Sequence, residues 1–378
     1  MSKMLGSPRT LAIFIIVAAV FVLSILGGAL GEAFGLGFLS SSLPAIQLPA
    51  EKITDVAGFE LMNTMVTTWL AMVVLIGLGI YLRVRMNEVP GRLQALFELI
   101  VEFFLTLCES VAGKEKARRF FPLVFTIFAF IVIANWMGIL PGFATVGRIA
   151  DPEEIAHHHD VHEYHDPALT HDKKLETEKK DNGHHGDEHH DDKSHLGSVK
   201  LHVFSKLGAF NFLSPGSLKD ELTFSEYEEK HGDVGENKRA GHLVPYLRSA
   251  NTDVNTTLAM AIVAMVMVHF WGFSILGVRL HVGKFINFKE GPIGFFVGIL
   301  ELISELAKVV SFTFRLFGNI FAGEVLLMAM GFLLPMIGII PFLGLELFVG
   351  VIQAFIFSML TLVFASMASV SHGDNDHH

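Results

Sequence analysis

The stretch SFTFRLFGNIFAGE, residues 311–324, places Arg315, Asn319 and Glu324 inside a run of more than forty mostly apolar residues. Ionisable side chains are costly at membrane depth, and those found there usually face a bundle interior or a water-filled cavity on an ion or proton path. The segment therefore predicts that these polar residues serve the passage of ions or protons rather than contact lipid.

Helical geometry sorts the polar residues of this run onto two faces. At 100° per residue, Glu324 lies about 140° away from Glu301 and so faces another way. The other charged residues of this run, together with Asn319, fall within about 40° of Glu301 and form one narrow polar stripe. The stripe consists of Glu301, Glu305, Lys308, Arg315 and Asn319.

A second apolar run, residues 342–370, follows a turn near Pro335 and Pro341. In this run Glu346 and Gln353 are seven residues apart and share a helix face. We expect that face to meet Glu324 or Asn319 across a helical hairpin.

A purely structural interpretation stays open beside the ion path. Glu301 could pair with Lys308, and Arg315 with a carboxylate, only to hold the hairpin together, because structural ion pairs also occur in such networks.

The elements that must position these residues are membrane helices. Half of the 378 residues are hydrophobic, the mean hydropathy is +0.50 and phenylalanine alone contributes 34 residues. A bilayer core of about 30 Å requires roughly 20 helical residues. Apolar segments of sufficient length run near 11–28, 64–82, 120–140, 256–278, 293–334 and 342–370.

These segments predict an all-α polytopic membrane protein with about five transmembrane helices plus an N-terminal signal or anchor. If residues 293–334 form one helix, it is about 63 Å long, twice the hydrocarbon thickness, so it must tilt steeply, break or lie along the membrane. The fold therefore ends in a long tilted helical hairpin within a domain spanning 251–370. Residues 1–31 are either a cleaved signal peptide or a retained anchor, and the sequence favours neither.

Residues 60–143 are expected to form a first transmembrane pair with an amphipathic helix between its two spans. Glu98, Glu102 and Glu109 share one face of that helix, and apolar residues cover the others. This pattern predicts a helix at the inner interface or against a partner. The alternative is a tilted span whose polar residues are buried in the bundle.

Basic residues next to the spans predict the orientation, since cytoplasmic ends carry an excess of lysine and arginine. All three basic groups fall on one side if each segment crosses once, which places residues 144–250 outside and the tail 371–378 inside. The groups are Arg83, Arg85 and Arg92; Lys114, Lys116, Arg118 and Arg119; and Arg279, Lys284 and Lys289.

The outward segment opens with a histidine- and aspartate-rich insert, residues 151–198, which we expect to be disordered because it has few large apolar residues. The formal net charge of −10 arises in residues 151–242, where acidic residues outnumber basic ones by 21 to 11. The irregular spacing specifies no metal site, and the insert could also buffer protons at the mouth of a channel. Its speculative ligands are His157, His158, His159, His184, His185, His189 and His190.

Several motifs together resemble one known family. SFTFRLFGNIFAGE occurs with the downstream QAFIF and SMAS, and it follows NWMGILPG at 135–142 and DVNTTLAMA at 253–261. In this order the motifs resemble subunit a of the membrane sector of F-type ATP synthases, over about 60–142 and 250–370.

The resemblance implies a subunit that forms two offset proton half-channels beside a rotating ring of c subunits in a bacterial inner membrane. Carried over, Arg315 faces the ring, Asn319 and Gln353 are the polar residues near it, and Glu324 lines a half-channel. The implied partners are the c-ring, the b subunits of the peripheral stalk and the rest of the complex, and no cofactor is implied.

One position departs from the family, because many bacterial relatives have a histidine where this chain has Glu346. Two glutamates that lie close would titrate as a pair, which suits either a proton relay or sodium handling. The coupling ion is therefore left open between proton and sodium.

A metal-ion transporter with a histidine-rich loop is the rival from another class. Such a carrier needs ligands paired within its spans. His269 lies in a span, and we expect no second histidine beside it, which argues for a packed or hydrogen-bonded side chain. The sequence also lacks the phosphate-binding motif GxxxxGK[ST], so a non-catalytic, ion-translocating subunit is the favoured interpretation.

Overall fold

The computed structural model describes residues 8–32, 34–36, 50–56, 58–152, 200–205, 211–212, 221–230, 238–285, 291–335 and 338–370. Helices dominate these residues, which confirms the predicted fold class. Five helices are long and apolar enough to cross a membrane: Arg9–Gly27, Asn63–Val84, Lys114–Gly138, Val254–Leu276 and Ile339–Ala368. The chain divides into two compact units, which we describe in turn.

The first unit contains a small antiparallel sheet that the sequence did not predict. Its strand order is β6-β4-β8-β5-β7, and Ala150, Leu201, Phe224, Ala240 and Val244 form its core. A helix, α8 (Phe224–Glu229), follows β7 and begins with a capping box between Thr223 and Glu226. The strands are β4 (Val146–Ala150), β5 (Lys200–Ser205), β6 (Asn211–Phe212), β7 (Glu221–Thr223) and β8 (Lys238–Pro245).

The same unit contains the N-terminal helices α1 (Pro8–Gly27) and α2 (Ala29–Glu32). Gly28 separates them and packs against the backbone of Leu333 and the ring of Pro335, so closely that a Cβ at position 28 would overlap both. Only glycine fits this contact without a shift of the neighbouring backbone.

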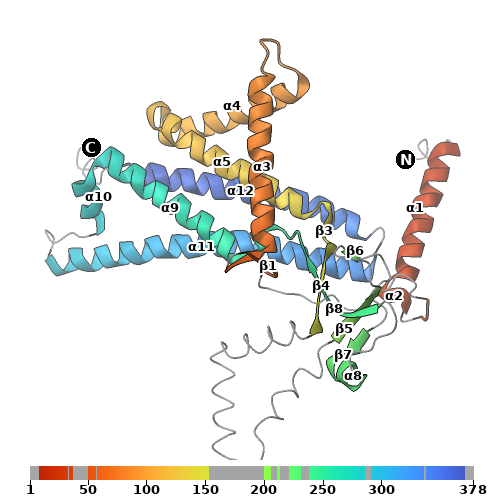
Figure 1. The fold of residues 1–378 in the computed structure, drawn as a ribbon. Coiled ribbons are helices and arrows are strands. Elements are labelled where there is room, and N and C mark those ends of the chain that lie inside the picture. Colours follow the sequence, from red (N-terminus) through yellow and green to blue (C-terminus); the bar gives the residue numbers. More distant parts are fainter. Residues whose placement is uncertain are drawn as a thin grey trace, which may run out of the picture. The chain divides into compact units, whose positions relative to one another are not determined.

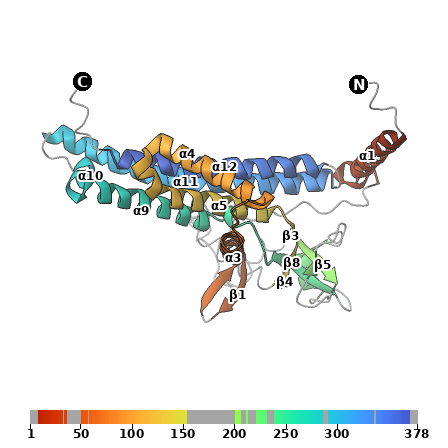
Figure 2. The same cartoon turned by 90° about the horizontal axis from the view of Figure 1, so that it is seen from above.

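The second unit holds the remaining helices apart from residues 328–339, at the turn of the long hairpin, which belong to the first unit (Figures 1 and 2). It begins with a hairpin of β1 (Lys52–Val56) and β2 (Phe59–Met62). The elements that follow are α3 (Asn63–Val84), α4 (Arg92–Ala112), α5 (Lys114–Gly138), β3 (Pro141–Ala144), the short 3-10 helix η2 (Ala250–Thr252), α9 (Val254–Leu276), α10 (Val278–Phe285), α11 (Gly291–Leu333) and α12 (Ile339–Ala368).

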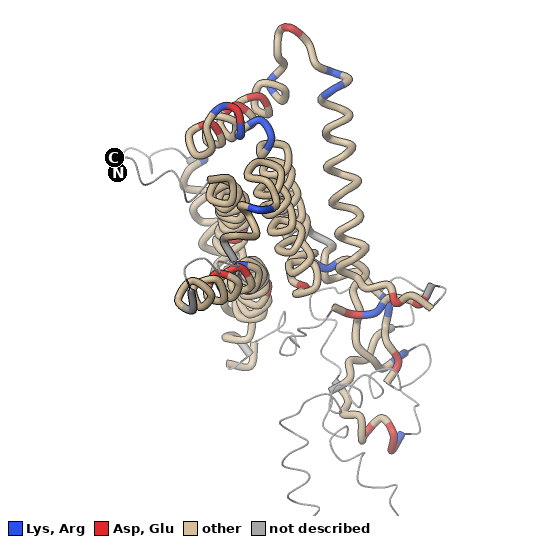
Figure 3. The backbone as a smooth tube through the Cα atoms, turned by 90° about the vertical axis from the view of Figure 1, so that its left-hand side faces the viewer, with Lys and Arg blue, Asp and Glu red and all other residues tan. Residues whose placement is uncertain are grey.

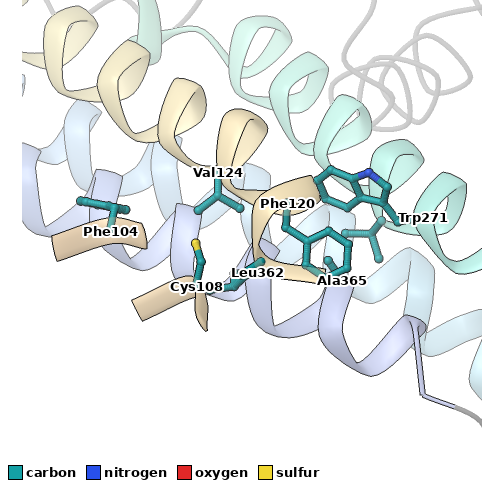
Figure 4. Packing of buried hydrophobic residues seen from close by; sticks show 9 residues of the cluster. Phe104, Cys108, Phe120, Val124, Trp271, Leu362 and Ala365 are labelled. Atoms are coloured by element: carbon teal, nitrogen blue, oxygen red, sulfur yellow. The ribbon is translucent and has the colours of Figure 1, made fainter. Parts of the chain in front are cut away.

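Two apolar clusters join the helices of the second unit. One brings α4, α5, α9 and α12 together, with Phe120 against Trp271 at a ring-centroid distance of 4.6 Å (Figure 4). The other joins α5, α9, α11 and α12, where the small side chains of Ala261, Ala264 and Ala354 are fully buried. In lipid such small residues let helix backbones approach closely, so association rests on packing and hydrogen bonds.

A buried polar contact fixes α5 against its neighbours. The amide nitrogen Nδ2 of Asn135 donates to the backbone oxygen of Gly350 on α12 at 3.2 Å, and its Oδ1 accepts from Nδ2 of Asn251 at 2.6 Å. Gly350 lies directly on Asn135, where an added Cβ would come within 3.1 Å of the Asn135 Cβ. Asn135 thus links α5 to both η2 and α12.

The first helix of the hairpin, α11, is continuous and about twice as long as a bilayer core is thick. The 22 residues of α3 span about 33 Å, which matches a bilayer core, whereas the 43 residues of α11 span about 64 Å. Figure 1 shows α11 and α12 side by side and α3 crossing them steeply. If α3 follows the membrane normal, the hairpin helices are strongly tilted.

The amphipathic segment forms a separate helix, α4, as predicted. It packs Phe104 and Cys108 into the cluster with α5 and α12, while Glu98 and Glu102 are exposed. The alternative with these carboxylates buried in the bundle is therefore wrong.

The ends of two helices far apart in the sequence meet in the second unit. Lys116 at the start of α5 donates to the backbone oxygen of Ser369 after α12 at 3.2 Å. Figure 3 shows charged residues gathered at the α3–α4 connection and the start of α5, whereas α3 is uncharged over most of its length. The start of α5 and the end of α12 therefore lie at the same end of this unit.

Candidate functional site

The predicted contact across the hairpin is present between Asn319 and Gln353. Nδ2 of Asn319 on α11 donates to Oε1 of Gln353 on α12 at 2.8 Å. Gln353 is buried, at 2% exposure, whereas Asn319 lies at the exposed side of α11. The pair fixes the register of the two helices at the level of Arg315.

Arg315 lies on the exposed side of α11. Its NH2 group is 3.5 Å from Oγ of Ser311, one turn earlier on the same helix. In the described ranges no acidic side chain lies within 4 Å of Arg315, and the neighbouring Val310 and Phe314 are more than half exposed. The interpretation of Arg315 as half of an ion pair inside the hairpin therefore finds no support among these residues.

A second group of charges lies further along α11. Nε of Arg248, just before α9, is 3.5 Å from Oε1 of Glu324. Glu346 on α12 is 8% exposed, and its carboxylate is close enough to that of Glu324 for their charges to interact. The predicted meeting of Glu324 and Glu346 across the hairpin thus occurs, with an arginine added.

Glycine makes room for the Glu346 carboxylate. A Cβ at Gly323 would overlap both carboxylate oxygens of Glu346, so the side chain lies directly on the α11 backbone next to Glu324. The small residue at position 323 is thus what allows Glu346 to approach α11.

This arrangement favours the uptake of a single cation or proton. Two close carboxylates repel each other, so a proton or a cation bound between them relieves the repulsion. The positive charge of Arg248 compensates one of the two negative charges, which leaves one for a mobile ion.

Arg248 is a candidate site residue that the sequence analysis missed. One signal was available, because an arginine at the predicted outward end of a span departs from the usual concentration of basic residues at cytoplasmic ends. Its partner Glu324 is 76 residues away in the sequence, so the pairing itself is visible only in the structure.

The first half of the polar stripe differs from the predicted pairing. Lys308 pairs with Glu305, with 2.6 Å between Nζ and Oε1, while Glu301 is exposed. A pair between Glu301 and Lys308 is therefore wrong. Glu305 is nearer to Lys308 because the two are three residues apart on one helix face.

The expectation that no second histidine accompanies His269 is also wrong. Nδ1 of His269 is 3.2 Å from Nε2 of His281 on α10. The chain turns at Gly277, where φ is +81°, and α10 then folds back on α9. Glycine adopts this φ without strain, and the turn brings together two histidines that are twelve residues apart.

Within the described part of the chain, no group of three or more histidine, cysteine, aspartate or glutamate residues could hold a metal ion. The histidine-rich insert with His157, His158, His159, His184, His185, His189 and His190 lies outside the described residues, as does the tail 371–378.

The fold and these contacts define a polytopic helical membrane protein with polar groups built into its last two long helices. The family model described as ATP synthase A chain matches residues 65–153 and 222–366, more than half of the chain. The chain therefore belongs to the ATP synthase A chain family.

The relatives agree with this assignment. The chain is similar to the ATP synthase subunit a of Mycobacterium bovis, at 27% identity over 81% of this chain and 86% of the relative. It is 38% identical to that of Desulforamulus reducens over 46% of this chain and 64% of the relative, and 25% identical to that of Gloeobacter violaceus over 84% and 86%. Its role is that of a membrane-sector subunit a, which works with the other subunits of an ATP synthase.

Proposed function

We propose that this chain forms the stationary side of two proton half-channels and couples proton flow to the rotation of a ring of c subunits. The observation that carries the proposal is Arg315, an exposed cation on a membrane helix with no acidic partner among the described residues. A charged side chain at the centre of a membrane helix costs about 3 kcal/mol on insertion scales. A carboxylate on the ring would offset that cost.

The chemistry of arginine explains how Arg315 would enforce rotation. Its guanidinium stays charged at any working pH. A ring carboxylate that approaches it is favoured in its ionised form, so it releases its proton before passing. The same positive charge repels a proton that moves straight between the half-channels, and protons must therefore travel on the ring.

The outer half-channel would contain the charged group further along α11. Glu346 and Glu324, with Arg248 beside them, take up the proton, and the Asn319–Gln353 pair lies between them and Arg315. The inner half-channel would follow the first half of the polar stripe, with Glu301, Glu305 and Lys308.

The proposed function also includes the membrane, the orientation and the partners of the subunit. The basic groups favour residues 144–250 outside and the tail 371–378 inside. The family resemblance favours a bacterial inner membrane. The partners are the c-ring and the b subunits, the subunit itself is non-catalytic, and residues 1–31 serve as a signal or an anchor. Sodium is the alternative coupling ion, since two close carboxylates also suit a small cation.

ATP-driven acidification of inverted membrane vesicles tests the proposal. With Arg315→Ala we expect pumping to fall to background while the complex still assembles, and Arg315→Lys should fail as well, because lysine lacks the rigid planar fork. Full pumping by Arg315→Ala would overturn the assignment. A requirement for sodium in the unsubstituted complex would change the coupling ion from proton to sodium.

A further inference from the structure

A second polar cluster lies on the opposite side of Arg315 from Glu324 and joins three helices. His281 of α10 contacts His269 of α9 at 3.2 Å between Nε2 and Nδ1. Nε2 of His269 is 3.6 Å from Oε2 of Glu305 on α11, whose other oxygen, Oε1, accepts from Lys308 at 2.6 Å. The four side chains form one continuous line from α10 to α11.

The surroundings hold this line in place. His281 is 2% exposed, and Gly272 on α9 lies so close to its imidazole that a Cβ there would overlap the ring. Phe273 packs edge-on against the same imidazole, with 4.5 Å between ring centroids. On the other side, Nζ of Lys308 lies 4.9 Å from the centre of the Phe364 ring of α12.

Imidazole is suited to pass protons along such a line. It gains or loses a proton near neutral pH and has two distinct nitrogens. In His269 one nitrogen faces another histidine and the other faces a carboxylate, so a proton can arrive on one side of the ring and leave from the other. A histidine used only for packing has no need of titratable groups at both nitrogens.

The position of these four side chains along α11 also suits a proton path to Arg315. Glu305 precedes Arg315 by ten residues, about 15 Å along the helix, and Glu324 follows it by nine, about 14 Å. Titratable groups thus flank Arg315 on both sides. His281, at the other end of the line, lies two residues after Arg279, on the side that the basic residues assign to the cytoplasm.

We propose that His281, His269 and Glu305 conduct protons between the inner end of α10 and the polar stripe of α11. An excess proton on His281 passes from Nε2 to Nδ1 of His269, and His269 releases its Nε2 proton to Oε2 of Glu305. A tautomer exchange of His269 then resets the line, and the reverse order carries protons inward. Lys308 balances the Glu305 charge between transfers. The inference rests on the proposed function and adds residues to its inner half-channel.

Passive proton conduction by membranes from which the catalytic sector has been removed tests this line. We expect His269→Gln to lower the conduction at least tenfold. Glutamine retains hydrogen bonding, but its amide cannot take up and release a proton. In His269→Ala, imidazole added to the medium should restore part of the loss, which a purely structural role would not predict. Phe270→Leu is the matched control, because it lies next to His269 on α9, is 59% exposed and removes no titratable group, and it should conduct within about twofold of the parent complex.

Assembly is checked by the amount of chain that co-purifies with the ring. If His269→Gln does not assemble, Glu305→Gln is measured in the same way, since its amide oxygen can still accept from Lys308. Normal conduction in either assembled variant, or a loss that imidazole does not restore, would overturn the proposed line. ATP-driven acidification by Arg315→Ala, measured in parallel, separates the two proposals, because the half-channel function stands if that variant fails to pump while the histidine variants conduct normally.

Discussion

Arg248 and Gly323 illustrate how single residues shape the outer group of charges. Arg248 supplies a fixed positive charge 3.5 Å from Glu324, and Gly323 leaves the space that the Glu346 carboxylate fills. The two glutamates can therefore lie together across the hairpin. Charge compensation comes from a segment ahead of α9 instead of from the return helix itself.

Gly323→Ala should disrupt this group without removing any charge. The new Cβ would overlap the Glu346 carboxylate and force it away from Glu324. We expect ATP-driven acidification of inverted vesicles to fall roughly 10- to 100-fold, in line with the cost of misplacing a functional group by about 1 Å. Gly331→Ala is the control on the same helix, because its Cβ would meet only the Ile339 side chain at 3.7 Å. Equal pumping by the two variants would show that the position of Glu346 is not important.

At the scale of elements, the membrane helices are joined by a few buried polar contacts among mostly small and aromatic side chains. Asn135 bonds to both Asn251 and the backbone of Gly350, which sets the position of α5 relative to η2 and α12. Asn319 and Gln353 set the register of α11 and α12 in the same way. These contacts decide which polar side chains meet across the hairpin.

Asn135→Ala should weaken the helix assembly. It leaves the buried Asn251 amide without its acceptor, a loss that typically costs 1–3 kcal/mol. We expect a lower midpoint of thermal unfolding for the solubilised complex than with Thr126→Ala. Thr126 is an exposed residue of α5 whose hydroxyl bonds only within its own helix, to the Pro122 backbone. Identical midpoints for the two variants would count against a structural role for Asn135.

At the scale of the whole molecule, the direction of insertion determines which cluster serves which side of the membrane. In the proposed orientation, which the basic residues beside α3, α5 and α9 favour, the α3–α4 connection lies inside and the sheet with α8 lies outside. In the proposed function, the group with Arg248 would then serve the outer half-channel, and the two histidines would serve the inner one.

Labelling of introduced cysteines with a membrane-impermeant maleimide tests this direction. Glu88→Cys should be labelled only in inverted vesicles, and Glu229→Cys only in right-side-out vesicles, because both positions are exposed. The native Cys108 gives little background, since burial raises the pKa of its thiol to about 11. Its thiolate is therefore scarce near pH 7, and its labelling should rise only as the pH approaches 11. The opposite labelling pattern would reverse the assignment of the two half-channels.

The sequence by itself determined the membrane class, the apolar spans in α1, α3, α5, α9 and α12, the separate helix α4 and the polar stripe on α11. Length, hydropathy and the 100° helical repeat are local properties, and the membrane requires each span to satisfy its own backbone hydrogen bonds. Spacing within the helix also placed Glu346 and Gln353 on one face, but it left open whether that face meets Glu324 or Asn319.

Only the tertiary structure decided which distant groups meet. Arg248 reaches Glu324, and α10 folds back so that His281 meets His269, because packing and a glycine turn bring these segments together. The small sheet also escaped prediction, since its strands are short and most pair with strands far away in the sequence. Pairing across such separations depends on the fold as a whole, whereas a helix depends on the residues within a few turns of one another.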